Sequence, residues 1–146
     1  MGILYIQMLK KDTTLQGETD LQILLKTMRP QLNEGEFVFC TLPSLEGFDL
    51  AELLFFFKES ESITVVLKKE VADKLGLPYN FVAAWITLTV HSALEAVGLT
   101  AAFSNTLAKH GISCNVVAAY YHDHIFVGKN DAQKAMEVLT ALAKGD

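Results

Sequence analysis

Two segments of this 146-residue chain carry the side chains best suited to chemistry. The first is Tyr120-Tyr121-His122-Asp123-His124, in which two imidazoles flank a carboxylate. A His-x-His pair on a strand, with an aspartate as third ligand, is a donor set for zinc and other transition metals. The same residues also form hydrogen-bonded hairpin corners, in which aspartate accepts from turn amides and histidines pack on tyrosines. The other two histidines, His91 and His110, belong to other elements, so the spacing does not supply a fourth metal ligand. The spacing therefore favours the hydrogen-bonded hairpin corner over a metal site.

The second segment runs from Ser92 to Thr100 and contains Gly98, where a helix is expected to begin. A helix N-terminus has unpaired backbone N–H groups and a partial positive charge, so it suits a carboxylate or phosphate. Gly98 permits close approach of a ligand, and Ser92 lies in the connection that precedes it. The alternative is that Gly98 only relieves a tight turn and that Ser92 caps a bend.

Few features of the sequence support catalysis. Cys114 is expected to face the core, where burial disfavours a thiolate. The chain has no GxSxG elbow, no Walker loop and no GxGxxG. Glu59 and Glu61 pair two carboxylates, but they lie in a polar turn where solvation explains them. We therefore predict no catalytic residue, no metal site and no cofactor, and a protein that is not an enzyme.

The elements that position the two segments follow from the hydrophobic pattern of the C-terminal half. Residues 85–90 alternate apolar and polar, which predicts a strand with one buried face. After it the pattern predicts a helix over 99–110 stopped by Gly111, strands over 112–119 and 124–127, and a helix over 131–143. The order β-α-β-β-α is most of a ferredoxin-like split βαβ unit.

The N-terminal half gives weaker patterns. Thr19 and Gln22 have the spacing of a capping box, and a helical stripe follows until Pro30 ends or bends it near Arg29. Beyond it we expect a strand over 37–42, a loop over 43–48, a hairpin of 53–57 with 63–67, and a short helix over 70–75 ended by Gly76.

The segment HSALEAVGLTAAFSNTLAKHGISCNVVAAYYHDHIFV resembles the second half of small bacterial proteins with two ACT domains. Weaker likeness extends through LLKTMRPQLNEGEFVFCTL and SITVVLKKEVADKLGL, so the resemblance covers residues 19–142. It implies an α+β fold of two ferredoxin-like, ACT-type subdomains, with antiparallel sheets, helices on one face and elements exchanged between the halves. The implied division is an N-terminal extension at 1–16, a first subdomain at 17–78 and a second at 79–146.

ACT domains are small-molecule sensors that bind amino acids and control biosynthetic enzymes, so the resemblance implies a non-catalytic sensor that regulates a partner. The expected ligand is an amino acid or a related metabolite. The ligand-binding residues expected on this basis are Ser92, Val97, Gly98, Leu99, Thr100, Asn115, His122 and Asp123. Two alternatives stay open: an interaction module without a ligand, and a metal-binding protein that uses His122, Asp123 and His124.

Composition limits the partners. A net charge of −5 disfavours nucleic acid and anionic membrane surfaces. Apolar residues make up 51% of the chain and the mean hydropathy is +0.28, so we expect a homo-oligomer that covers part of this surface. Strand edges, or an outward face formed by Thr87, Thr89 and Asn115, are the expected contacts.

The cellular setting is predicted from the cysteines and the N-terminus. Cys40 and Cys114 lie in apolar runs, as expected of reduced thiols in a cytoplasmic protein. The apolar stretch 3–9 is followed, not preceded, by Lys10 and Lys11, the wrong order for a secretory signal. An added edge strand, a disordered leader and a start-site artefact remain open for residues 1–16.

Overall fold

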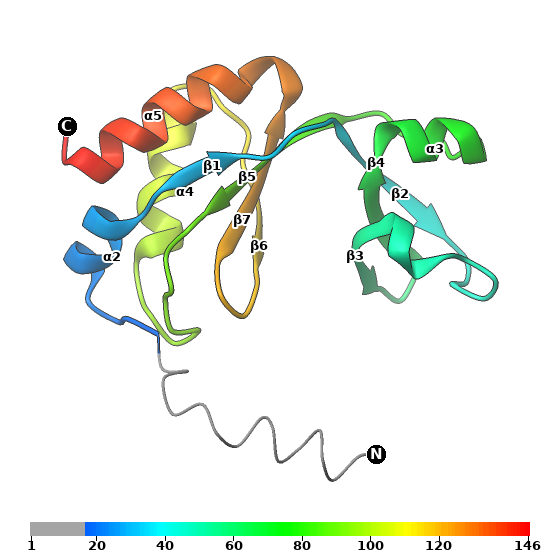
Figure 1. Ribbon diagram of the computed structural model, residues 1–146, viewed down its shortest axis with the longest axis horizontal. Helices are drawn as coiled ribbons and strands as arrows, with labels where there is room; N and C mark the ends of the chain where they lie inside the picture. Colours follow the sequence, from blue (N-terminus) through cyan, green and yellow to red (C-terminus); the bar gives the residue numbers. More distant parts are fainter. Residues whose placement is uncertain (1–16) are drawn as a thin grey trace, which may run out of the picture.

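The computed structural model describes residues 17–146, so the expected N-terminal extension lies outside the described residues. Within this range the strands form one antiparallel sheet in the order β3-β4-β2-β5-β7-β6, and β1 pairs with β5 (Figure 1). The strands are β1 (Pro30–Leu32), β2 (Phe37–Leu42), β3 (Leu53–Lys58), β4 (Ile63–Lys68), β5 (Val82–Leu88), β6 (Asn115–Ala118) and β7 (Asp123–Gly128). The helices are α2 (Leu21–Thr27), α3 (Lys69–Leu75), α4 (Leu99–Lys109) and α5 (Ala132–Lys144).

Strand β5 is shared between the two halves of the chain. Its first residues, Val82 and Ala83, pair with β2, and its residues 86–88 pair with β1. Strands β1, β5, β7 and β6 with α4 and α5 therefore make one ferredoxin-like unit, although β1 comes from the N-terminal half. The other unit consists of β2, β3, β4, the start of β5 and α3. The expected α+β fold with exchanged elements is confirmed.

All four helices cover the same face of the sheet. Side chains alternate along a strand, so Val82, Ile86 and Leu88 of β5 point to the helices. Under α2, α4 and α5 the largest fully buried side chains are Leu24, Met28, Ile86, Leu88, Phe103, Leu107, Ile125 and Leu139. A smaller core under α3 consists of Val38, Cys40, Val65, Leu67 and Ala72. The predicted position of the helices is confirmed.

The opposite face of the sheet is lined by aromatic side chains, and the sheet curls toward this face. The ring of Phe126 on β7 lies 5.8 Å, between centroids, from Phe55 on β3 and 5.4 Å from Phe39 on β2. Three strands separate β3 from β7, which in a flat sheet would place them about 19 Å apart. The sheet must therefore bend strongly. In Figure 1 the two halves lie on either side of the region where β2 meets β5.

Most predicted elements are confirmed, and the differences have local causes. The hairpin of β3 and β4 forms as expected, and Gly76 ends α3 with φ +66°. The first helix stops at Thr27, because Pro30 cannot donate a backbone hydrogen bond and begins β1 instead. The capping box at Thr19 is wrong: Asp20 is the N-cap, and its side chain accepts from the backbone N–H groups of Gln22 and Ile23.

The expected outward contact face of Thr87, Thr89 and Asn115 is only partly exposed: Asn115 is exposed, Thr89 is half-buried and Thr87 is buried. Thr87 is buried and accepts a hydrogen bond from Asn33 Nδ2 at 2.9 Å. The Thr89 hydroxyl donates to the backbone carbonyl of Arg29 at 2.7 Å. Both side chains are therefore used within the chain, where they hold β1 beside β5. In the described range no helix is long and apolar enough to cross a membrane.

Candidate functional site

The connection between β5 and α4 is held across the end of the sheet by the first described residues. Glu18 and Ser92 form an isolated parallel bridge: the Glu18 N–H donates to the His91 carbonyl at 2.8 Å, and the Ala93 N–H donates to the Glu18 carbonyl at 2.9 Å. A Cβ atom at Gly17 would overlap the backbone of Ala93. Glycine therefore permits the close approach that fixes this connection.

Helix α4 begins at the end of this connection without a side-chain cap. Its N-cap is Gly98, with φ +101°, and within residues 17–146 no side chain caps the first turn. Leu99 is buried in the core, whereas Thr100 is exposed. A Cβ atom at Gly98 would lie 3.0 Å from Leu21 Cδ2. Glycine is thus favoured by the turn, and a first turn of this kind, without a side-chain cap, suits an anion.

The hairpin of β6 and β7 supports the same end of the sheet. His122 Nδ1 donates to the Val90 carbonyl at 3.3 Å, which ties the hairpin to the connection. The ring of Tyr121 lies 5.0 Å from Tyr120 and 5.9 Å from His91. Asp123 is 7% exposed, and burial raises the pKa of its carboxyl. The corner is therefore packed and hydrogen-bonded.

The side chains of the His122-Asp123-His124 segment are not arranged to bind one metal ion. Asp123 lies on the helix side of β7, and His124 lies on the aromatic side, where its Nδ1 accepts from Trp85 Nε1 at 3.0 Å. Burial lowers the pKa of His124, and because Nδ1 accepts a hydrogen bond, the neutral imidazole carries its proton on Nε2. Within residues 17–146 no three His, Cys, Asp or Glu side chains are placed to hold a metal ion. The structure gives no support to the metal-binding alternative.

A pocket of about 200 Å³ lies between the connection and the hairpin turn. Its walls include Gly17, His91, Ser92, Leu94, Glu95 and Tyr120. Of the predicted ligand-binding residues only Ser92 lines it. Val97, Gly98, Leu99 and Thr100 come after the pocket residues along the chain, His122 precedes β7, and Asp123 is the first residue of β7. Of the predicted set, the structure therefore brings only Ser92 to the wall of this pocket.

Asn115 lies apart from this region. It pairs with Phe126 at the opposite end of β6, and its Nδ2 donates to the Phe126 carbonyl at 3.2 Å. Residue patterns did not indicate His91, Glu95 or Gly17 as pocket residues. Their positions depend on the backbone bridge to Glu18, which leaves no periodic signal in the sequence.

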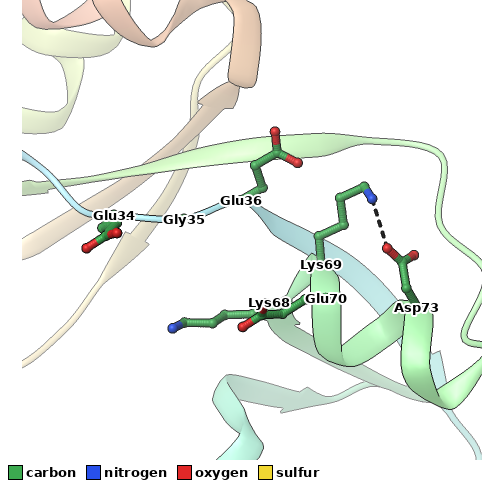
Figure 2. Close-up of a pocket in the computed structure, with 7 residues that line it drawn as sticks. All are labelled: Glu34, Gly35, Glu36, Lys68, Lys69, Glu70 and Asp73. Atoms are coloured by element: carbon green, nitrogen blue, oxygen red, sulfur yellow. Dashed lines mark hydrogen bonds and ion pairs between the residues drawn. The ribbon is translucent and has the colours of Figure 1, made fainter.

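A larger hollow of about 450 Å³ lies between the β1–β2 connection and α3 (Figure 2). Lys69 Nζ contacts Asp73 Oδ2 at 2.8 Å, so this lysine is already paired. In Figure 2 the side chains of Glu34, Glu36 and Lys68 point in different directions. The charged groups do not converge on one point, so this hollow is not a strong candidate site.

The fold and this region define an ACT-type protein, and comparisons agree. Two family profiles described as ACT domain match residues 16–84 and 80–141. A solved structure from Vibrio cholerae, a protein of unknown function described as a possible transport protein, is 50% identical to this chain. The match covers 84% of this chain and 95% of that chain, with a TM-score of 0.77. The chain belongs to the proteins built from two tandem ACT domains.

More distant structures share the fold. A protein from Agrobacterium tumefaciens is 15% identical over 80% of this chain and 89% of its own, with a TM-score of 0.61. The ligand-free regulatory subunit of aspartate kinase from Thermus thermophilus is 12% identical over 80% and 97%, with a TM-score of 0.56. A comparison with curated proteins finds no match.

Proposed function

We propose that this protein is a non-catalytic sensor that binds an amino acid and passes its occupancy to a partner protein. Membership in a family of regulatory ACT domains supports a sensing role. One observation supports the position of the site: α4 begins at a glycine with no side-chain cap, three residues along the chain after Glu95 of the pocket wall. A helix start of this kind favours a carboxylate.

The pocket also offers groups for the rest of a zwitterion. The ligand carboxylate would accept hydrogen bonds from the backbone N–H groups of residues 98–100, and Glu95 in the pocket wall would pair with its ammonium group. Hydrogen bonds to charged groups contribute about 1.5–3 kcal/mol each, so two would anchor a small ligand. The alternative is an interaction module whose site is empty.

A thermal-shift screen of the twenty amino acids tests the proposal. A ligand at 100 times its dissociation constant should stabilise the protein by about 2.7 kcal/mol. If no amino acid raises the melting temperature, the interaction module is favoured over the sensor.

Replacing Glu95 by glutamine should weaken binding of the identified amino acid at least about tenfold, because about 1.4 kcal/mol of charge pairing is lost. Isothermal calorimetry measures the change. Glu61→Gln is the matched control, since Glu61 is exposed in the β3–β4 turn, far along the chain from the pocket. Equal affinities for the parent protein and Glu95→Gln would remove Glu95 from the site.

The pocket is bordered by exposed apolar side chains, which supports the proposal of a homo-oligomer. Leu94 is 70% exposed, Val97 82%, Tyr120 53% and Tyr121 57%. Leu94 and Tyr120 both line the pocket, Tyr121 packs on Tyr120, and Val97 follows three residues after Leu94, which supports a shared apolar surface here. A second copy that covers this surface would also close the pocket.

The double variant Leu94→Glu/Val97→Glu should dissociate the oligomer, because it places charges in the buried contact. Light scattering at micromolar concentration should then report the chain mass of 16.1 kDa. Leu75→Glu, at a 53% exposed position on α3, is the control and should leave the assembly intact. A mass of 16.1 kDa for the parent protein would contradict the proposed oligomer.

The cysteines are consistent with action in the cytoplasm, which we include in the proposal. Cys40 and Cys114 are free, and burial raises the pKa of Cys114 to about 11. A thiol of this kind is protonated at neutral pH and reacts slowly.

A further inference from the structure

A second, apolar pocket of about 140 Å³ lies on the aromatic face of the sheet. It forms because the sheet curls and brings Phe55 of β3 against Phe126 of β7, with Trp85 of β5 in the wall between them. Val117 of β6 and Ala119 also border it. The amino-acid site proposed above lies at the end of the sheet and does not use these residues.

His124 supplies the polar group of this pocket. The Trp85 indole N–H is already donated to His124 Nδ1, so the indole has no hydrogen bond left for a ligand. Because Nδ1 accepts this bond, the imidazole proton lies on Nε2, which can donate to an acceptor atom. Thr87 Oγ1, 3.2 Å from Nδ1, holds the imidazole from the same side.

We propose that this pocket binds a second class of ligand: a single aromatic ring, about the size of phenol, that carries one hydrogen-bond acceptor. The volume is suited to one ring, because an engineered apolar cavity of about 150 Å³ binds benzene. Aromatic walls favour edge-to-face or offset contacts with a ring. Among the residues that the structure describes, no Lys, Arg, Asp or Glu lines the pocket, so a zwitterion would lose hydration without gaining a partner.

The protein carries its own reporter for this site. Trp85 is the one tryptophan of the chain, and it lines the pocket. Titration with phenol, with indole fluorescence excited at the red edge of its absorption, should give a saturable change. Phenol should bind about two- to tenfold more tightly than benzene, because only phenol accepts a hydrogen bond from His124. A change that grows linearly without saturation would overturn the proposal.

A filled pocket gives the matching test. Ala119 is exposed at the pocket rim, so Ala119→Leu should occupy the space without disturbing the core. Phenol affinity should fall at least about tenfold, with the melting temperature unchanged. Ala108→Leu, at an exposed position on α4, should bind phenol as the parent does. Equal phenol affinity in Ala119→Leu and the parent would overturn the proposal. Equal affinity of the parent for phenol and benzene would overturn the role of His124.

Discussion

Replacing Phe126 by alanine should lower the free energy of unfolding by about 3–5 kcal/mol, the largest effect we expect from one substitution. Phe126 is 1% exposed, and its ring lies within 6.5 Å, between centroids, of Phe37, Phe39, Phe55 and Trp85. These rings belong to both halves of the chain, so the variant removes the contact on which the curled sheet closes. Urea denaturation, followed by circular dichroism, measures the loss.

The control for this prediction is Phe57→Ala on β3. Phe57 is 66% exposed, so its truncation should change the free energy of unfolding by no more than about 0.5 kcal/mol. A loss below about 1 kcal/mol for Phe126→Ala would show that the aromatic face contributes little to stability.

Replacing Gly98 by valine should destabilise the protein by about 2–5 kcal/mol. A left-handed backbone costs a residue with a Cβ atom about 1–2 kcal/mol, and φ at Gly98 is +101°. The added side chain also meets Leu21, and overpacking costs about 1–3 kcal/mol more. Thermal and urea unfolding measure the total. This variant therefore reports on stability and cannot serve as a test of ligand binding with the fold intact.

Gly47→Val separates the two causes. Gly47 also has a positive φ, +73°, but no atom lies within 4 Å of its added Cβ. The loss of stability for Gly47→Val should equal the cost of the left-handed backbone alone. The additional loss for Gly98→Val should become smaller when Leu21 is also replaced by alanine. Equal losses at Gly98 and Gly47 would exclude the contact with Leu21 as a cause.

The elements that sequence predicted well are those whose pattern is local. The β3–β4 hairpin is two apolar runs around a polar turn, and α3 and α4 are followed by glycines that end a helix. The end of the first helix was predicted near Arg29 from Pro30, and the helix stops two residues earlier, at Thr27. The strand β1, which begins at Pro30, was not predicted, because it pairs with residues 54 to 58 positions further along the chain.

The candidate site was predicted only in part, because its walls come from contacts that no local pattern records. Ser92 and Gly98 were found from the expected helix start. The bridge of Glu18 to Ser92 uses backbone groups alone, so neither Glu95 nor His91 could be assigned to a pocket. The aromatic pocket was missed for a different reason. Phe55 and Phe126 meet only when the sheet bends, and alternation along a strand carries no information on bending.

Because β5 pairs with strands of both halves, we expect the two ACT domains to unfold as a single unit. A cut between residues 78 and 79 would sever three register pairs with β1 and two with β2. Each fragment would then expose an unpaired strand edge and an open core, a state that favours aggregation over folding. Ligand binding at one end of β5 would therefore stabilise the pairing of β5 with strands of both halves. A metabolite bound beside α4 would slow amide exchange as far away as β2, although it touches no atom there.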